Sequence, residues 1–231
     1  VIDMLFPPGT PARIPIFAIT GTNGKTTTSR LIAHILKNSG RTVGFTTTDG
    51  TYIGNQQIVA GDNTGPVSAQ LVLKDPTVDV AVLETARGGI IRSGLGFDYC
   101  DIGVVLNIAA DHLGLKDVNT LEDLARVKSV VPRAVSRRGY AVLNAEDKLV
   151  YEMKERTEGT VVCFSMDENH PNIKRRAERG RVSCVYENGY VTILKGKWKV
   201  RVEKVVNIPL TYGGRAEFMV QNVLAATLAC F

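Results

Sequence analysis

Residues 21–27, with the sequence GTNGKTT, have the composition and spacing of a phosphate-binding loop. Glycines let backbone N–H groups turn toward an anion, and the start of a helix adds further N–H groups at the same point. Lys25 can reach the β- and γ-phosphates of a nucleotide, and the Thr26 hydroxyl is placed to ligate Mg²⁺. The general pattern GxxxxGK[ST] has glycine at position 19, where this chain has Ile19 and begins its glycines at Gly21 instead. The loop is therefore a variant of the general nucleotide-binding pattern.

The elements around this loop are predicted by hydrophobic periodicity. From residue 14 to about residue 165, short β-branched runs alternate with amphipathic stretches, which predicts an α/β fold with a mainly parallel sheet flanked by helices. The predicted strands cover residues 14–19, 42–47, 78–84, 102–107, 140–143 and 161–164. The predicted helices cover residues 25–37, 67–74, 121–136, 147–156 and 216–230. Thr120 and Asp123 form an expected N-cap pair at the third helix, and the loop joins the first strand to the first helix, as a phosphate loop requires.

The pattern changes after about residue 181, where apolar and polar residues alternate with period two. Asn188-Gly189 is a strong hairpin signal, and residues 195–197 form a second turn signal. We therefore predict a small antiparallel meander over residues 182–210 within one domain that covers residues 14–231, with residues 1–13 as a linker from a preceding domain.

Composition excludes several classes of protein. Apolar residues make up 44% of the 231, but no run approaches the roughly 20 apolar residues of a membrane helix, and the first residues do not resemble a secretory signal. The four cysteines form no CxxC pair and are expected to be buried hydrophobes in a cytoplasmic protein. The net charge of +5 suits an anionic ligand such as a nucleotide. The densest basic cluster lacks interleaved aromatic residues, so we interpret it as a solvated helix face and expect no binding of nucleic acid. This cluster comprises Lys174, Arg175, Arg176, Arg179 and Arg181.

Five motifs in order resemble those of the Mur ligase superfamily. ITGTNGKTTT at residues 19–28 resembles the nucleotide loop of that superfamily, and MVQNVLAA at residues 219–226 resembles its adenine-contacting helix. Between them lie LETARGG at residues 83–89, NIAADHLG at residues 107–114 and LARVKSVV at residues 124–131. Single short motifs are weak, whereas five in order at suitable spacing are specific. The resemblance implies the central, ATP-binding domain of such a ligase.

The resemblance also implies roles for individual residues. ATP would be bound by Gly21, Thr22, Asn23, Gly24, Lys25, Thr26, Thr27 and Asn222. Thr26, Glu84 and His112 would hold two Mg²⁺ ions, and Lys128 would be the lysine that many Mur ligases carbamylate. Lys25, Glu84, His112 and Lys128 would thus form the catalytic set. The plainer alternatives are a solvated strand end for Glu84, a structural histidine for His112 and a solvated lysine for Lys128.

Within the superfamily the chain is most similar to the cyanophycin synthetases, through TTTDG at residues 46–50, GDNTGP at residues 61–66 and the long segment 84–105. That similarity implies activation of a carboxylate as an acyl phosphate, followed by addition of arginine to aspartate side chains of a poly-aspartate backbone. It also implies an ATP-grasp region before this segment, a third Mur-type domain after it and a homo-oligomeric whole protein, so that the isolated segment would be poorly active. The expected substrate-binding residues are Thr48, Asp49, Asp62, Asn63, Thr64, Arg87 and Arg92.

Three alternatives remain at this point. The chain could be another Mur-type amino-acid ligase, acting on a peptidoglycan precursor or on poly-γ-glutamate. It could instead be a nucleotide-binding module without catalysis. A regulatory GTPase also pairs a GKT loop with an Asp-x-x-Gly segment, but the sequence has no guanine-reading NKxD.

Overall fold

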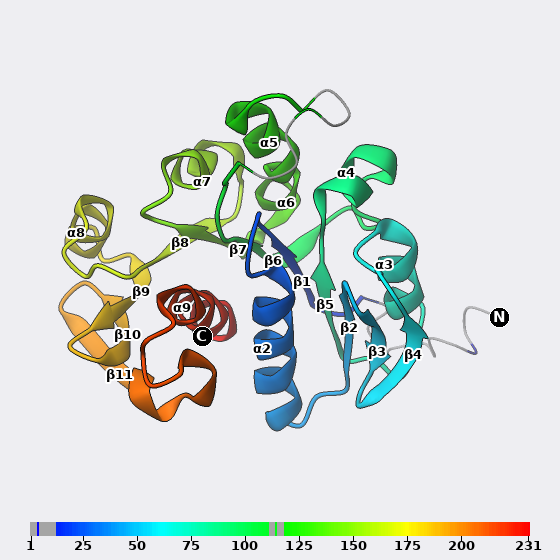
Figure 1. The fold of residues 1–231 in the computed structure, drawn as a ribbon, viewed down its shortest axis with the longest axis horizontal. Helices are drawn as coiled ribbons and strands as arrows, with labels where there is room; N and C mark the ends of the chain where they lie inside the picture. The colour runs from blue at the N-terminus through cyan, green and yellow to red at the C-terminus, as the bar shows by residue number, and fades with distance from the viewer. Residues whose placement is uncertain (1–3, 5–12, 111–113, 115–117) are drawn as a thin grey trace.

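Eleven strands form one sheet across the part of the chain that the computed structural model describes, namely residue 4, residues 13–110, residue 114 and residues 118–231. Their order across the sheet is β11-β10-β9-β8-β7-β6-β1-β5-β2-β3-β4 (Figure 1). The strands are β1 (Ile16–Thr20), β2 (Val43–Thr47), β3 (Gly50–Ile53), β4 (Gln56–Ala60), β5 (Val80–Glu84), β6 (Cys100–Val105), β7 (Val135–Asn144), β8 (Thr160–Ser165), β9 (Val182–Glu187), β10 (Tyr190–Lys195) and β11 (Trp198–Lys204).

The middle of the sheet is parallel and both of its edges are antiparallel. Every neighbouring pair from β2 through β5, β1, β6, β7 and β8 to β9 runs parallel. At one edge β9, β10 and β11 form the predicted antiparallel meander, which is confirmed as a continuation of the main sheet. At the other edge β3 and β4 extend β2 antiparallel, a hairpin that we did not predict. It turns at Gly54, whose φ of 57° is easily reached by glycine.

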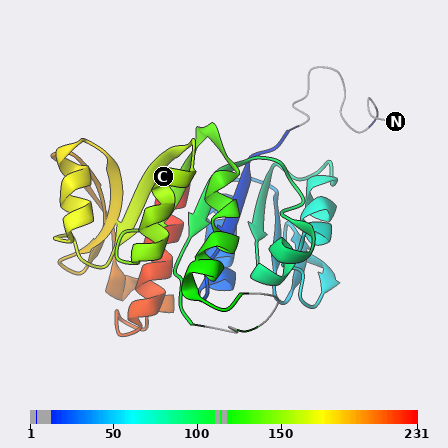
Figure 2. The same cartoon turned by 90° about the horizontal axis from the view of Figure 1, so that it is seen from above.

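Helices cover both faces of the sheet. One layer consists of α2 (Lys25–Asn38) and α9 (Glu217–Cys230), which pack against each other and on opposite halves of the same face (Figure 1). The other layer runs along the opposite face, as the view from above shows (Figure 2). Its helices are α3 (Pro66–Leu73), α4 (Arg87–Ser93), α5 (Leu121–Lys128), α6 (Val130–Arg133), α7 (Lys148–Glu152) with the 3-10 helix η1 (Met153–Arg156), and α8 (Pro171–Glu178). Two further 3-10 helices, η2 (Val205–Asn207) and η3 (Pro209–Thr211), precede α9.

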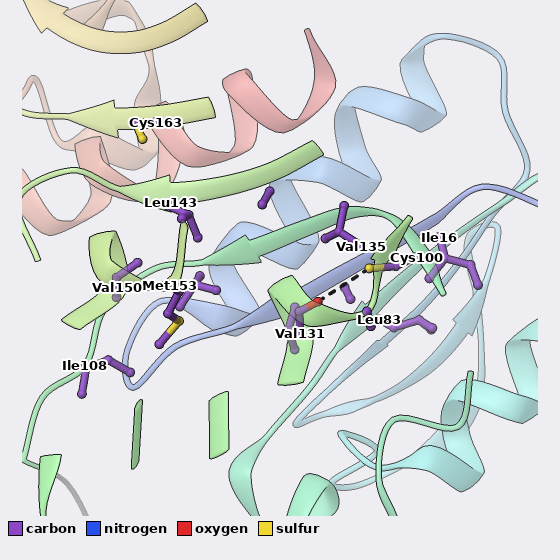
Figure 3. Close-up of a cluster of buried hydrophobic side chains, with 14 of the residues drawn as sticks. Ile16, Leu83, Cys100, Ile108, Val131, Val135, Leu143, Val150, Met153 and Cys163 are labelled. Carbon is purple, nitrogen blue, oxygen red and sulfur yellow. Dashed lines mark hydrogen bonds between the residues drawn. The ribbon is translucent and has the colours of Figure 1, made fainter. Parts of the chain in front are cut away.

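Each side of the sheet has its own apolar core, because successive side chains of a strand point to opposite faces. Phe17 and Ile19 of β1 lie in the core under α2 and α9, whereas Ile16 and Ala18 lie in the core under α3 to α8. Figure 3 shows part of this second core, in which the Cys100 thiol lies 4.0 Å from the Val131 carbonyl oxygen. β1, which leads into the phosphate loop, is therefore packed between two apolar cores.

The structure divides the predicted helix 121–136 into two short helices and starts the next strand five residues earlier than predicted. Thr120 caps α5 as expected, accepting a hydrogen bond from the Asp123 N–H while Asp123 accepts one from the Thr120 N–H. Pro132 has no N–H to donate within a helix, so the regular helix stops near it and Val135 pairs with Cys100. No helix in the described ranges is long and apolar enough to cross a membrane.

Candidate nucleotide-binding site

Three neighbouring strand ends meet at the phosphate loop. β1 lies between β5 and β6, and all three run parallel, so their carboxyl ends lie side by side. The loop follows β1, Glu84 ends β5 opposite Ile19, and Asn107 follows β6. Ligands of open α/β sheets bind at such carboxyl ends, where the direction of the chain connections reverses. The sheet thus brings together residues that lie far apart in the sequence.

Asn107 holds the phosphate loop in place. Its side-chain oxygen accepts hydrogen bonds from the N–H groups of Asn23 at 2.8 Å and Thr22 at 3.1 Å, and its side-chain nitrogen donates to the Asn23 carbonyl at 3.1 Å. Its backbone carbonyl accepts a further bond from the Thr22 N–H at 2.9 Å. Sequence reasoning missed this role, although the NIAADHLG motif that begins at Asn107 was a signal for it.

Two lysines reach the backbone of the same loop. Lys25 Nζ donates to the Thr22 carbonyl at 2.8 Å, and Lys128 Nζ, from α5, donates to the Gly21 carbonyl at 2.8 Å. Lys128 is buried, so the solvated alternative for this lysine does not hold. Both ammonium groups therefore bring positive charge to the place where phosphates would lie, while carbamylation of Lys128 stays a prediction.

Glu84 is a buried acid beside the loop. It is 2% exposed, and one of its oxygens, Oε2, accepts a hydrogen bond from the Thr26 hydroxyl at 2.9 Å, which also lies 3.1 Å from the Thr48 hydroxyl. The other oxygen, Oε1, is buried and has no hydrogen-bond partner among the described residues. Burial raises the pKa of Glu84, and the hydrogen bond from Thr26 and the charge of Lys25 oppose that rise.

These oxygens suit a magnesium ion. Mg²⁺ prefers hard oxygen ligands, and an unpaired carboxylate oxygen in a buried place is costly unless a cation or a donor meets it. Thr26 and Glu84, both predicted metal ligands, are in direct contact. The third predicted ligand, His112, lies outside the described residues.

A polar cavity of about 310 Å³ opens beside Lys25 and Lys128. Four of the predicted substrate residues line it, from two loops and the start of α4. Thr64, 6% exposed, is fixed by two hydrogen bonds to Asp62, from its N–H at 3.2 Å and its hydroxyl at 2.7 Å. The lining consists of Thr22, Lys25, Thr48, Asp62, Thr64, Ala86, Arg87, Gly88, Leu124 and Lys128.

The other three predicted substrate residues do not line this cavity. Asn63 is a buried residue of the 61–66 loop. Its side chain donates to the Gly61 carbonyl at 2.6 Å and accepts from the Ser68 hydroxyl at 2.9 Å. Asp49 forms an ion pair with Arg30. Arg92 donates from Nε to the Gly88 carbonyl within its own helix at 3.0 Å. The structure thus gives these side chains local partners of their own.

A second hollow, of about 380 Å³, lies on the other side of the loop against α9. Gly24 has φ of +84°, and a Cβ atom added there would overlap the side-chain oxygen of Asn222. The predicted adenine contact is therefore packed directly on the loop. The lining consists of Asn23, Gly24, Thr27, Asn107, Phe218, Met219, Gln221 and Asn222.

Comparison with known proteins assigns this arrangement to a family. The Mur ligase middle domain profile matches residues 19–230, from the end of β1 to the end of α9. The chain belongs to the Mur ligase middle domain family. The predicted family and fold class are confirmed, and this middle domain contains every described residue that we predicted to be functional.

Relatives of this Mur ligase middle domain include cyanophycin synthetases of Crocosphaera subtropica, 59% identical over 231 residues, and of Synechocystis, 58% identical over 231 residues. Each alignment covers 100% of this chain and 26% of the relative, so the chain spans about a quarter of the length of these curated relatives. A UDP-N-acetylmuramoyl-L-alanyl-D-glutamate–2,6-diaminopimelate ligase of Listeria monocytogenes is 30% identical over 96% of the chain and 45% of its own length.

Solved structures share the fold of this middle domain. A UDP-N-acetylmuramoyl-L-alanyl-D-glutamate–2,6-diaminopimelate ligase aligns with a TM-score of 0.68 at 23% identity, over 100% of this chain and 46% of that one. A bifunctional folylpolyglutamate synthase/dihydrofolate synthase with Mn, AMPPNP and L-glutamate bound aligns with a TM-score of 0.63 at 18% identity, over 95% of this chain and 54% of that one. At these identities the similarity establishes the architecture.

Proposed function

We propose that this chain is the ATP-binding core of an ATP-dependent amide-bond ligase, which activates a carboxylate as an acyl phosphate before an amine attacks it. The observation that carries the proposal is the buried Glu84 carboxylate, with one oxygen on the Thr26 hydroxyl and the other unpaired, at the end of the strand next to the phosphate loop. This carboxylate and the Thr26 hydroxyl together suit a magnesium ion that would neutralise phosphate charge during transfer of the phosphoryl group.

The main obstacle to such a reaction is charge. A carboxylate must approach a polyphosphate, and two like unit charges 4 Å apart repel by about 4 kcal/mol at an effective dielectric constant of 20. Lys25, which donates to the loop backbone, offsets this repulsion, and the N–H groups of the loop add to its effect. Magnesium held by Thr26 and Glu84 would supply further neutralisation of the phosphate charge.

The acceptor carboxylate would lie in the cavity beside Lys25. Arg87 lines that cavity together with Asp62 and Thr64. Guanidinium groups bind carboxylates through two parallel hydrogen bonds, so Arg87 is the residue that we assign to the acceptor. The Asp62 carboxylate supports this arrangement by fixing the Thr64 backbone and hydroxyl.

We further propose that the whole protein adds arginine to aspartate side chains of a poly-aspartate backbone. The support is the 59% identity to a cyanophycin synthetase over the full length of the chain. Another Mur-type ligase is the second candidate, and its support is the 30% identity to a diaminopimelate ligase. For the first candidate we expect an ATP-grasp region before this segment, a third Mur-type domain after it, a homo-oligomer and a cytoplasmic location.

The decisive experiment measures ATP-dependent phosphate release by the full-length protein, with a poly-aspartate primer and each amino acid in turn. We expect release with arginine and its loss in the Lys25→Ala variant. Release with diaminopimelate or glutamate, but not with arginine, would support the second candidate. ATP binding without release for any acceptor would leave a nucleotide-binding module and end the ligase proposal.

A further inference from the structure

A basic groove lies on the α3–α8 layer, between α7 with η1 on one side and α8 on the other (Figure 1). Its volume is about 620 Å³, and its floor is the amino end of β8. Five of its lining residues are cationic, and they come from two separate segments of the chain. The full lining consists of Tyr151, Lys154, Glu155, Glu158, Gly159, Thr160, Val161, Arg175, Arg176, Arg179 and Arg181.

The arginines of the groove lack acidic partners. Among the described residues, no carboxylate lies within ion-pair distance of the four arginines at positions 175, 176, 179 and 181. Of the two acids in the lining, Glu158 pairs with Arg137 outside the groove, at 2.8 Å. The other acid, Glu155, lies 4.0 Å from Lys154, so the lining holds five cations and two acids, and its net positive charge favours an anionic ligand.

Two of these arginines are held in position by the backbone and by neighbours. One nitrogen of Arg176 donates to the Val161 carbonyl at 2.6 Å and to the Val182 carbonyl at 3.2 Å, while its Nε is buried without a hydrogen-bond partner. Arg175 donates to the Asn172 side-chain oxygen at 2.6 Å. A guanidinium fixed in this way loses less conformational freedom on binding, so the groove is partly organised for its ligand.

We propose that this groove binds an acidic, carboxylate-rich polypeptide at a place separate from the nucleotide site. Guanidinium groups match the planar carboxylate, and several of them along one groove match a chain of repeated aspartates. Nucleic acid fits less well, because Tyr151 is the single aromatic ring in the lining and Lys154 lies over it, with Nζ 4.1 Å from the ring centroid. The inference rests on the proposed function, whose acceptor is such a polypeptide.

The distance between groove and loop sets the length of polypeptide that can occupy both. β8 is three strands from β1, and the groove is at the amino end of β8 while the loop is at the carboxyl end of β1. At about 4.8 Å between strands and about 3.3 Å per residue along a strand, the two places are roughly 20 Å apart. An extended polypeptide of about seven residues spans that distance. A polymer held in the groove would raise its own concentration at the ligase site, whereas a shorter acceptor would not.

Binding of a fluorescent aspartate homopolymer to the chain, in the presence of saturating ATP to occupy the loop, tests the proposal. The groove variant is Arg179→Gln/Arg181→Gln, because both residues are exposed and neither side chain has a hydrogen bond to another described residue. The matched control is Lys74→Gln/Lys174→Gln, which removes the same charge from exposed positions outside the groove, one of them on α8 itself. We expect Kd to rise about tenfold in the groove variant and to stay within about twofold in the control. An equal rise of Kd in both variants would mean that net charge alone attracts the polymer. An unchanged Kd in both would also refute the groove as the binding site.

Two further measurements distinguish this proposal from nucleic-acid binding and from the proposed ligase function. Single-stranded DNA of similar length should bind more weakly than the aspartate polymer. If DNA instead binds more tightly, and the groove variant abolishes that binding, the groove is a nucleic-acid site. The same protein is also assayed for phosphate release, which depends on the phosphate loop, whereas polymer binding depends on the groove. A failed ligase assay with intact groove binding would therefore count against the proposed function alone, and the reverse result would count against the groove alone.

Discussion

Replacing Gly24 by alanine tests the contact between the phosphate loop and the last helix. Gly24 has φ of +84°, a conformation that costs an alanine roughly 1–2 kcal/mol relative to glycine. The new methyl group would also overlap the side-chain oxygen of Asn222 and lie 3.0 Å from its Cγ atom. Because both groups belong to the candidate adenine hollow, the substitution should affect nucleotide binding as well as stability.

Gly40 provides the matched control, since it has φ of +85° and no atom within 4 Å of an added Cβ. Gly40→Ala should therefore lose the same backbone energy and nothing else. At about 3 °C of Tm for each kcal/mol in a domain of this size, Gly40→Ala should melt about 3–6 °C lower, and Gly24→Ala should melt lower still because of its overlap with Asn222. Only Gly24→Ala forces Asn222 to move, by about 1 Å, and a misplacement of that size can cost about a hundredfold in a well-formed site.

Thermal unfolding and titration with a fluorescent ATP analogue separate the two effects. We expect ATP affinity to fall at least about tenfold in Gly24→Ala and to stay unchanged in Gly40→Ala. The double variant Gly24→Ala/Asn222→Ala removes the overlap, so its Tm should return toward that of Gly40→Ala without recovery of ATP binding. Equal ATP affinity in the two single variants would refute the packing of Asn222 on the loop as part of the site.

Three other predictions follow from the same region and from the core. Glu84→Gln should keep or raise Tm, because burial raises the pKa of Glu84 and thus disfavours its charged form, while the Mg²⁺ dependence of ATP binding disappears in a magnesium titration. Asn107→Ala removes three side-chain hydrogen bonds to the loop, each worth about 1 kcal/mol, so ATP affinity should fall at least about tenfold in the same fluorescence titration. The buried thiols should resist Ellman's reagent at pH 8 until denaturant is added, because burial raises the pKa of Cys100 to about 12, that of Cys163 to about 11 and that of Cys184 still further. Since a raised thiol pKa keeps the unreactive protonated form, labelling in the native state would contradict the buried core.

The central part of the fold was predictable because its signals are local. The strand before Gly21, the loop itself and the helix that begins at Lys25 each follow from residue types within a few positions, and the meander follows from Asn188-Gly189. The hairpin of β3 and β4 was missed because every residue of Gln56–Ala60 is exposed, so no apolar alternation marks the second strand. Helix α4 was missed because Gly88 and Gly89 in its first turn lower its helix propensity.

Side-chain partners across the chain were less accessible to sequence reasoning. Asp49 was predicted near the substrate from its motif, but the structure pairs it with Arg30 on α2, nineteen positions away. Asn107 begins a motif that was noticed for His112, and its contact with the loop depends on β6 lying beside β1. The basic cluster was interpreted as a solvated helix face because it lacks interleaved aromatic residues, and its sequence gives no sign that Lys154 of η1 lies across a groove from it.

Helix α9 is synthesised after the strands that it covers. It packs on α2 and on β6 to β10, so one face of the sheet has half of its cover in residues 217–230. During synthesis at about 5–20 residues per second, the strands and the phosphate loop leave the ribosome before this helix does. During that interval Phe164, Ile193 and their neighbours have no helix above them, and Asn222 is absent from the loop. Residues 217–230 therefore complete both the apolar core on that face and the candidate adenine hollow.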